Sequence, residues 1–378
     1  MTDVAGRWAA KEEANKITYK RYKPFVDAVR TFVSEAQDGE RIYFGIPEFD
    51  QQMRGIGKGQ LCIINGYSHS GKTLFVSHLL KHNRDKKIVF ANPDEPRALI
   101  LAKLAALVHG VPADEMEDRV ARGDATAIDL LTTTATEWFP NLIVDDKPAS
   151  SESMEQLWDE ACEVFDGKPD LFIFDYAELL QAGETVPQKF DFLKGFGSRH
   201  EVPMLILHQT SRSAGAEGRR MTISSGAFGG EQHATFQIGV WRKKAAIIAE
   251  LVELEDKIAR AARGATEGAI ARQAELRMDL EKHEYTLTAA ITKNKRPGQR
   301  EGRDEIDFEL WGATGTLVPL GETDLPVQYR EQLDKQAQER KKMVGERKGG
   351  IDNIPLDAAM DSIMAPASEE AWDDSGSF

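Results

Sequence analysis

Eight residues around position 70 form the motif with the most specific chemistry in the sequence. Gly66-Tyr67-Ser68-His69-Ser70-Gly71-Lys72-Thr73 matches G-x-x-x-x-G-K-[ST] at every fixed position, between an apolar run and an amphipathic helix pattern. The glycines allow close approach to phosphate oxygens, and the loop N–H groups form an anion cradle with the start of the helix. The lysine reaches the β- and γ-phosphates, and the threonine hydroxyl binds Mg²⁺. The sequence therefore predicts a nucleoside triphosphate site at Gly66, Ser68, Ser70, Gly71, Lys72 and Thr73.

Two later strands end in polar residues that fit this chemistry. The run 171–175 places Asp175 after four apolar residues, which is the pattern of an aspartate that holds Mg²⁺ from the tip of a strand. The run 202–209 ends in Gln209, whose amide is placed to sense the γ-phosphate. An ordinary polar residue at a strand end gives the same local pattern for Gln209.

A pair of carboxylates follows the predicted strand 87–92. Asp94 and Glu95 come after Pro93 and before an apolar helix that begins near Arg97. Carboxylates on the same rim as the phosphate loop are well placed to orient an attacking water. Acidic residues also stabilise the N-terminus of a helix, so the catalytic interpretation is only modestly favoured.

The long segment 210–231 is rich in Gly and Ser and carries three arginines. The chain has a formal net charge of −14, from 48 basic and 62 acidic residues, so any nucleic-acid contact requires a local basic strip. Long loops in compact domains are usually functional or disordered. The arginines are therefore the predicted contacts to a phosphate backbone: Arg212, Arg219 and Arg220.

A second basic group ends the predicted strand 285–291, in the run Lys293-Asn294-Lys295-Arg296-Pro297-Gly298. A run of cations is most often a solvated surface. Because this run closes a strand of a nucleotide-binding sheet, a finger that acts on the site of a neighbouring subunit is the functional alternative.

Strands alternating with helices predict an α/β fold with a mostly parallel central sheet over residues 41–320. Residues 1–40 form an N-terminal helical arm, which packs either on a neighbouring subunit or on its own domain. The apolar spacing within 244–283 predicts an inserted helical hairpin. Residues 321–378 are a charged helix followed by a disordered acidic tail, which either docks on a partner or only aids solubility.

Cysteine content and hydropathy predict a cytoplasmic protein. The only cysteines, Cys62 and Cys162, give neither a disulfide framework nor a metal-binding spacing, and Cys62 lies in an apolar run as a small core residue. No window approaches 18 uninterrupted apolar residues, and the N-terminus has no apolar signal region. We therefore expect no membrane partner.

Together these motifs resemble the RecA-like ATPase domain of DnaB-type replicative helicases, over roughly residues 41–320. The most specific matches are the stretches PDEP, FDYAELL, HEVPMLILHQTSR, SSGAFGGEQHATFQIGVWRK and ITKNKRPG. The resemblance implies ATP and Mg²⁺ as cofactors, single-stranded DNA as partner, and a homo-oligomeric ring, expected to be a hexamer. It assigns Mg²⁺ binding to Asp175 and γ-phosphate sensing to Gln209.

Two departures from the family pattern leave roles open. The family's catalytic glutamate aligns with Asp94, whereas the glutamate of this chain is one residue later, at Glu95. The family's lysine and arginine finger align with Lys293 and Lys295, and Arg296 follows. The family's N-terminal domain is not recognisable, which implies a minimal phage-type enzyme of the bacterial host cytoplasm.

The predicted function is an ATP-dependent, ring-forming DNA helicase that acts in DNA replication, with replication proteins as partners of the acidic tail. A RecA-like recombination or strand-annealing ATPase and a nucleotide-switched helicase loader are the alternatives. One fold hosts all three functions. The HQTSR and KNKRPG stretches favour the helicase.

Overall fold

The computed structural model describes residues 29, 32–33, 40–210, 220–222, 232–260, 267–296, 305–321 and 324–347. The chain divides into two units, Met1–Pro326 and Val327–Phe378. Apart from residues 29, 32–33 and 40, the predicted N-terminal arm lies outside the described residues, as does the predicted disordered tail after residue 347. The described part of the second unit is one long helix, α12 (Val327–Arg347), in the region where the sequence predicts a charged helix.

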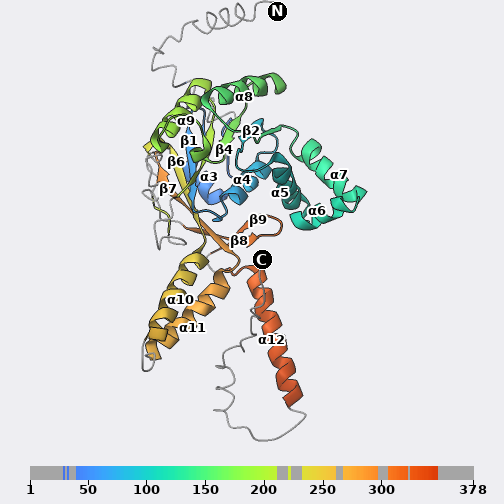
Figure 1. Cartoon of the computed structure of the whole chain (residues 1–378), viewed down its shortest axis with the longest axis vertical. Helices are drawn as coiled ribbons and strands as arrows, with labels where there is room; N and C mark the ends of the chain where they lie inside the picture. Colours follow the sequence, from blue (N-terminus) through green and yellow to red (C-terminus); the bar gives the residue numbers. More distant parts are fainter. Residues whose placement is uncertain are drawn as a thin grey trace, which may run out of the picture. The chain divides into compact units, whose positions relative to one another are not determined.

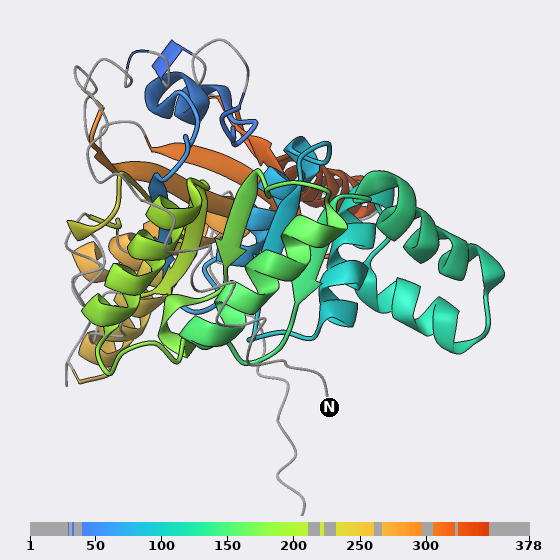
Figure 2. The same ribbon diagram turned by 90° about the horizontal axis from the view of Figure 1, so that it is seen from above.

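A nine-stranded sheet forms the centre of the first unit, in the order β3-β2-β4-β5-β1-β6-β7-β8-β9 (Figures 1 and 2). The first six strands in this order are parallel, and β7, β8 and β9 add to β6 as antiparallel strands. The strands are β1 (Leu61–Gly66), β2 (Ile88–Ala91), β3 (Leu142–Asp145), β4 (Leu171–Phe174), β5 (Met204–Gln209), β6 (Phe236–Trp241), β7 (Thr286–Asn294), β8 (Ile306–Trp311) and β9 (Thr316–Pro319). The expected mostly parallel α/β sheet is confirmed.

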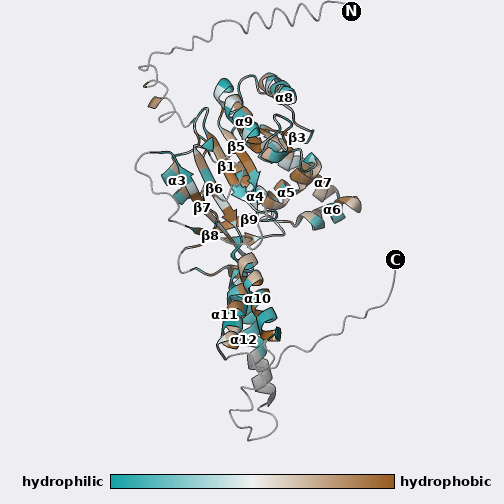
Figure 3. Cartoon of the chain, turned by 60° about the vertical axis from the view of Figure 1, so that its left-hand side comes forward, coloured by the Kyte–Doolittle hydropathy of each residue, from teal (hydrophilic) through white to brown (hydrophobic). Residues whose placement is uncertain are grey.

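Helices cover both faces of this sheet, which explains why its central strands are continuous apolar runs. One face packs against α3 (Pro47–Met53), α4 (Lys72–His82) and α5 (Arg97–His109). The other face packs against α8 (Ser151–Val164) and α9 (Val186–His200). Figure 3 shows the hydrophobic residues gathered along the strands. Cys62 lies buried in β1, as predicted, and burial raises the pKa of its thiol, which therefore stays protonated.

Four elements between residues 45 and 138 are absent from the sequence prediction. The expected irregular lead-in over residues 45–60 contains α3, which begins at Pro47 and buries Phe49 and Met53. The Asp50 carboxylate of this helix accepts hydrogen bonds from the N–H groups of Phe44 and Gly45, at 2.7 and 2.8 Å. After α5 come α6 (Ala113–Ala121), α7 (Ala125–Thr133) and a π-helix, η1 (Thr134–Trp138).

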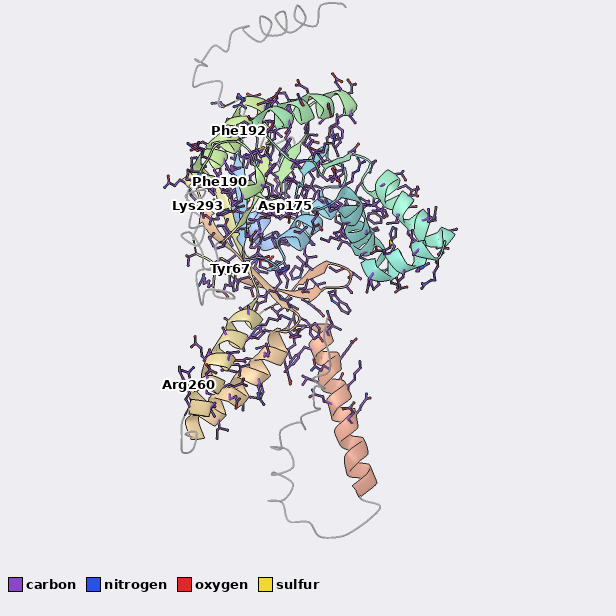
Figure 4. The ribbon with its side chains drawn as sticks, viewed as in Figure 1. Tyr67, Asp175, Phe190, Phe192, Arg260 and Lys293 are labelled. Atoms are coloured by element: carbon purple, nitrogen blue, oxygen red, sulfur yellow. The ribbon has the colours of Figure 1, made fainter. Side chains whose placement is uncertain are left out.

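Two helices join β6 to β7 on either side of the undescribed residues 261–266. They are α10 (Lys243–Arg260) and α11 (Glu267–His283), which pack against each other. Each contains one buried leucine, Leu251 and Leu276. Ion pairs from Arg272 to Glu250 and from Arg277 to Glu255 link the two helices. Figure 4 shows Arg260 at the far end of α10. Within the described residues, no helix is both long and apolar enough to cross a membrane.

Candidate nucleotide site

The carboxyl ends of β1, β4 and β5 meet at one edge of the sheet, where α/β proteins place their ligands. A pocket of about 330 Å³ lies there. Nine of the predicted site residues line it together: Ser68, Ser70, Gly71, Lys72, Thr73, Asp94, Glu95, Asp175 and Gln209. Four segments that are distant in the sequence therefore converge where the phosphate loop predicts a triphosphate.

The phosphate loop needs its two fixed glycines for steric reasons. Gly71 has φ +97°, and a Cβ there would collide with the Leu287 side chain of β7. A Cβ on Gly66 would collide with the Ser70 hydroxyl and lie 2.7 Å from the Val240 carbonyl oxygen. Any larger residue at either position would push the loop off the sheet and away from its phosphate-binding conformation.

The Lys72 ammonium group is held inside the loop. Its Nζ donates hydrogen bonds to the carbonyl oxygens of Gly66, at 2.9 Å, and Tyr67, at 2.8 Å. Burial lowers the pKa of Lys72, and the negative charges of Asp175, Glu178 and Asp94 oppose that shift. A phosphate group in the pocket would offer this cation a far stronger acceptor than two neutral carbonyl groups.

Asp175 follows β4 and lines the pocket together with the phosphate loop. Its Oδ2 lies 3.5 Å from the Thr73 hydroxyl, which donates to it. The side chain is 5% exposed, and burial raises its pKa to about 7, with Lys72 opposing the shift and Asp94 and Glu95 adding to it. A buried carboxylate beside a hydroxyl is an oxygen donor pair of the kind that Mg²⁺ takes from a protein. The described residues hold no cluster of three or more His, Cys, Asp or Glu that could bind a metal alone.

The structure distinguishes the two adjacent carboxylates after β2. Lys103, in the middle of α5, contacts both Glu95 carboxylate oxygens, at 2.5 and 2.6 Å. Among the described residues, no side chain forms a hydrogen bond or ion pair with the Asp94 carboxylate. Asn92, which ends the strand, accepts hydrogen bonds from the N–H groups of both acids, at 3.2 and 3.3 Å, and so fixes the turn that carries them.

The Glu178 carboxylate fixes the end of β5, which carries Gln209 into the pocket. The Glu178 side chain, in the short turn after Asp175, accepts a hydrogen bond from the Gln209 backbone N–H at 3.1 Å. The same oxygen lies 2.6 Å from Nδ1 of His208, which is buried. Glu178 therefore connects the turn that carries Asp175, after β4, to the end of β5, which carries Gln209.

Lys293, Lys295 and Arg296 do not join this pocket. β7 runs antiparallel to β6, with Asn294 opposite Phe236, so the turn after β7 lies at the edge of the sheet opposite the phosphate loop. Lys295 is exposed there, whereas Arg296 is partly buried with its guanidinium 5.7 Å from the centre of the Phe236 ring. The geometry excludes a role for this turn in the site of its own subunit.

Of the predicted DNA contacts, Arg212 and Arg219 lie outside the described residues. Arg220 is described, and its Nε lies 3.3 Å from Glu305. Lys243 lies 3.5 Å from the other oxygen of the same carboxylate. DNA phosphate would therefore have to replace Glu305 as the partner of Arg220.

A second pocket, of about 400 Å³, lies between α5, η1 and β3. Its lining is mostly apolar, including Ile100, Leu104, Phe139 and Val144, with Arg97 as its one charged residue. It holds no carboxylate or nucleophile for phosphoryl chemistry, so the smaller polar pocket is the candidate active site.

The sequence analysis does not identify Lys103 and Glu178 as site residues. Lys103 falls eight residues after Glu95, on the helix that the sequence predicts, and this spacing is the only signal that could have paired them. Glu178 gives no signal of its own, because its partners lie 30 residues away on another strand.

Comparison with known proteins agrees with this geometry. Residues 42–226 match the family model of the DnaB-like helicase C terminal domain. A solved DnaB-like replicative helicase, described with its interactions with primase, has a TM-score of 0.60 at 17% identity, over 83% of this chain and 71% of that chain. A solved ATPase domain has a TM-score of 0.56 at 16% identity, over 79% of this chain and 100% of that one. A search of curated protein sequences found no significant match.

The fold and the pocket define a P-loop ATPase of the RecA-like class. The two solved structures share this fold at low sequence identity. Residues 42–226 match the DnaB-like helicase C terminal domain, and this match implies ATP-dependent DNA helicase activity.

Proposed function

We propose that the protein is a ring-forming translocase that moves on single-stranded DNA and unwinds DNA in replication. The observation that carries the proposal is the convergence of Lys72, Thr73, Asp175, Asp94 and Gln209 on one pocket. The solved helicase with the longer matched region is described as replicative and as interacting with primase, which supports replication as the setting.

In the proposed reaction, the phosphate loop binds the triphosphate, and Lys72 moves from the loop carbonyls to the phosphates. Thr73 and Asp175 would hold Mg²⁺, and a bound Mg²⁺ would supply positive charge to the phosphates. The Asp94 carboxylate orients the attacking water, since Glu95 is neutralised by Lys103. Gln209 contacts the γ-phosphate and changes its position when that phosphate leaves.

The position of the basic turn supports assembly as a requirement for hydrolysis. Lys295 lies at the sheet edge opposite the pocket of its own chain and is exposed. In a ring of identical subunits, each subunit would present this edge to the nucleotide of its neighbour. Lys295 would then add a positive charge to the neighbour's pocket, with Lys293 and Arg296 beside it.

The test combines ATPase and strand-displacement assays. The wild-type protein is expected to hydrolyse ATP, to be stimulated by single-stranded DNA, and to displace a strand from a forked duplex. Lys72→Ala should abolish all three. ATP hydrolysis and DNA binding without strand displacement, at protein concentrations where rings form, would contradict the helicase proposal and favour the recombination-type alternative.

A further inference from the structure

Residues 210 and 220–222, the described residues between β5 and residue 232 (the arginine segment), contact the phosphate loop or share a buried cluster with it. Met221 is 1% exposed and packs in a small cluster with Tyr67, Trp241 and Ala290. Tyr67 is the second residue of the phosphate loop, and it is 7% exposed (Figure 4). The residue next to the predicted DNA contact Arg220 therefore packs in the same buried cluster as the nucleotide-binding loop.

A glycine in β6 makes room for this contact. All six residues of β6 are buried, and Gly239 lies at its centre. A Cβ on Gly239 would collide with the Cβ of Met221 and lie 3.1 Å from its Cγ. A glycine inside a buried strand weakens the strand, and it commonly marks a place where another part of the chain approaches closely. Here the approaching part is Met221.

A second contact lies at the start of the arginine segment. The Thr210 N–H donates a hydrogen bond to the Gly66 carbonyl oxygen at 3.2 Å. The same oxygen accepts from Lys72 Nζ, which also bonds the Tyr67 carbonyl. Both residues whose carbonyl groups hold Lys72 are thus linked to the arginine segment, Gly66 by the hydrogen bond from Thr210 and Tyr67 by the buried cluster that it shares with Met221.

We infer that Met221 is a positioning residue that couples DNA binding at the arginine segment to nucleotide binding at the phosphate loop. The inference rests on the proposed DNA function. A bound triphosphate draws Lys72 away from the carbonyls of Gly66 and Tyr67. The Tyr67 backbone then loses a charged hydrogen bond, and the ring transmits the adjustment to Met221 and its neighbour Arg220. By linkage, DNA on Arg220 changes nucleotide affinity by the same factor.

The test measures this coupling directly as binding. The dissociation constant of fluorescent oligo(dT) is determined with and without a non-hydrolysable ATP analogue and Mg²⁺, for the wild type and for Met221→Ala. Coupling between two sites typically changes affinity about 5- to 150-fold. We expect the ratio of the two oligo(dT) dissociation constants, without and with the analogue, to differ from one by a factor in this range for the wild type and by less than about twofold for Met221→Ala. The nucleotide affinity of Met221→Ala in the absence of DNA should be unchanged within about threefold.

The matched control is Met116→Ala. Met116 is also 1% exposed, but it lies in α6 within a separate cluster that includes Ala105 and Ala127. Met116→Ala removes the same atoms from a buried site and should keep the wild-type ratio of oligo(dT) dissociation constants. Met221→Leu, which preserves most of the buried volume, should retain the coupling. Gly239→Ala displaces Met221 by a different route, so it should abolish the coupling even if Met221→Ala fails to fold.

The outcomes separate the inference from the function on which it rests. A wild-type ratio in either Met221→Ala or a folded Gly239→Ala protein overturns the inference, as does an equal loss in Met116→Ala. If wild-type protein binds oligo(dT) with a ratio of one, the coupling is absent but the DNA function stands. If wild-type protein does not bind oligo(dT) under any nucleotide condition, the proposed function itself fails.

Discussion

Replacing Asp175 by asparagine should stabilise the nucleotide-free protein, and more so at higher pH. The side chain is 5% exposed, and its pKa rises from 3.8 to about 7 on burial. Because the folded chain favours the protonated acid, it binds more protons than the unfolded chain between these values. The unfavourable contribution of Asp175 is therefore absent below about pH 4, grows as the pH rises, and is complete above about pH 7.

The magnitude follows from the size of the shift. A rise of about three pKa units corresponds to about 4 kcal/mol at pH 8, and to about 1.5 kcal/mol at pH 5. These are upper limits for Asp175→Asn, since the amide also loses hydration when it is buried. We expect urea denaturation without nucleotide or Mg²⁺ to show a gain in the free energy of unfolding that increases by about 2 kcal/mol or more from pH 5 to pH 8.

An Asp→Asn substitution at an exposed position provides the control for this measurement. Asp85, whose side chain is 73% exposed, provides a matched Asp→Asn substitution that should change the free energy of unfolding by less than about 0.5 kcal/mol at either pH. Addition of ATP and Mg²⁺ should stabilise the wild type and have little effect on Asp175→Asn. A gain that is the same at pH 5 and pH 8, or a loss at both, would show that the buried charge is not destabilising.

Three further predictions concern catalysis and DNA binding. Asp94→Asn should lower ATP turnover about 10²- to 10⁴-fold. Glu95→Gln should lower it far less, because Lys103 already neutralises the Glu95 carboxylate. If steady-state kinetics show the reverse order, Glu95 is the residue that orients the water. Lys103→Ala leaves the Glu95 charge uncompensated beside Asp175, so it should weaken ATP binding in a fluorescence titration, and unchanged affinity would exclude this charge effect. Glu305→Gln removes a negative charge 3.3 Å from Arg220, so it should tighten oligo(dT) binding. Arg220→Ala should flatten the slope of log K against log salt by about 0.7, and an unchanged slope would remove Arg220 from the DNA site.

The parts of the fold that were predictable are those encoded in short runs of sequence. Strands β1, β4 and β5 are apolar runs followed or closed by Gly66, Asp175 and Gln209, and the structure places them where the sequence predicts. The nine pocket residues were predictable for the same reason, since parallel strands present their carboxyl ends at one edge.

The parts that were missed depend on contacts between distant segments. Helix α3 has only seven residues, too few to be stable alone, and it forms because Phe49 and Met53 are buried and Asp50 bonds the chain before it. The roles of Glu178 and Met221 depend on which strands are neighbours, and no local pattern encodes that order. The choice of Asp94 rather than Glu95 as the residue that orients the water likewise depends on the contact of Glu95 with Lys103 of α5.

The most direct test of the shared active site mixes two inactive variants. Lys72→Ala lacks the charge of the phosphate loop, and the double variant Lys295→Ala with Arg296→Ala lacks the charge of the opposite edge. Removal of such a finger lowers turnover about 10³- to 10⁵-fold in related phosphoryl-transfer enzymes. Because each variant keeps the half that the other has lost, mixed assemblies should regain DNA-stimulated ATPase activity at interfaces that pair an intact loop with an intact turn. Co-assembly of the two variants without any recovery of activity would contradict a site shared between subunits.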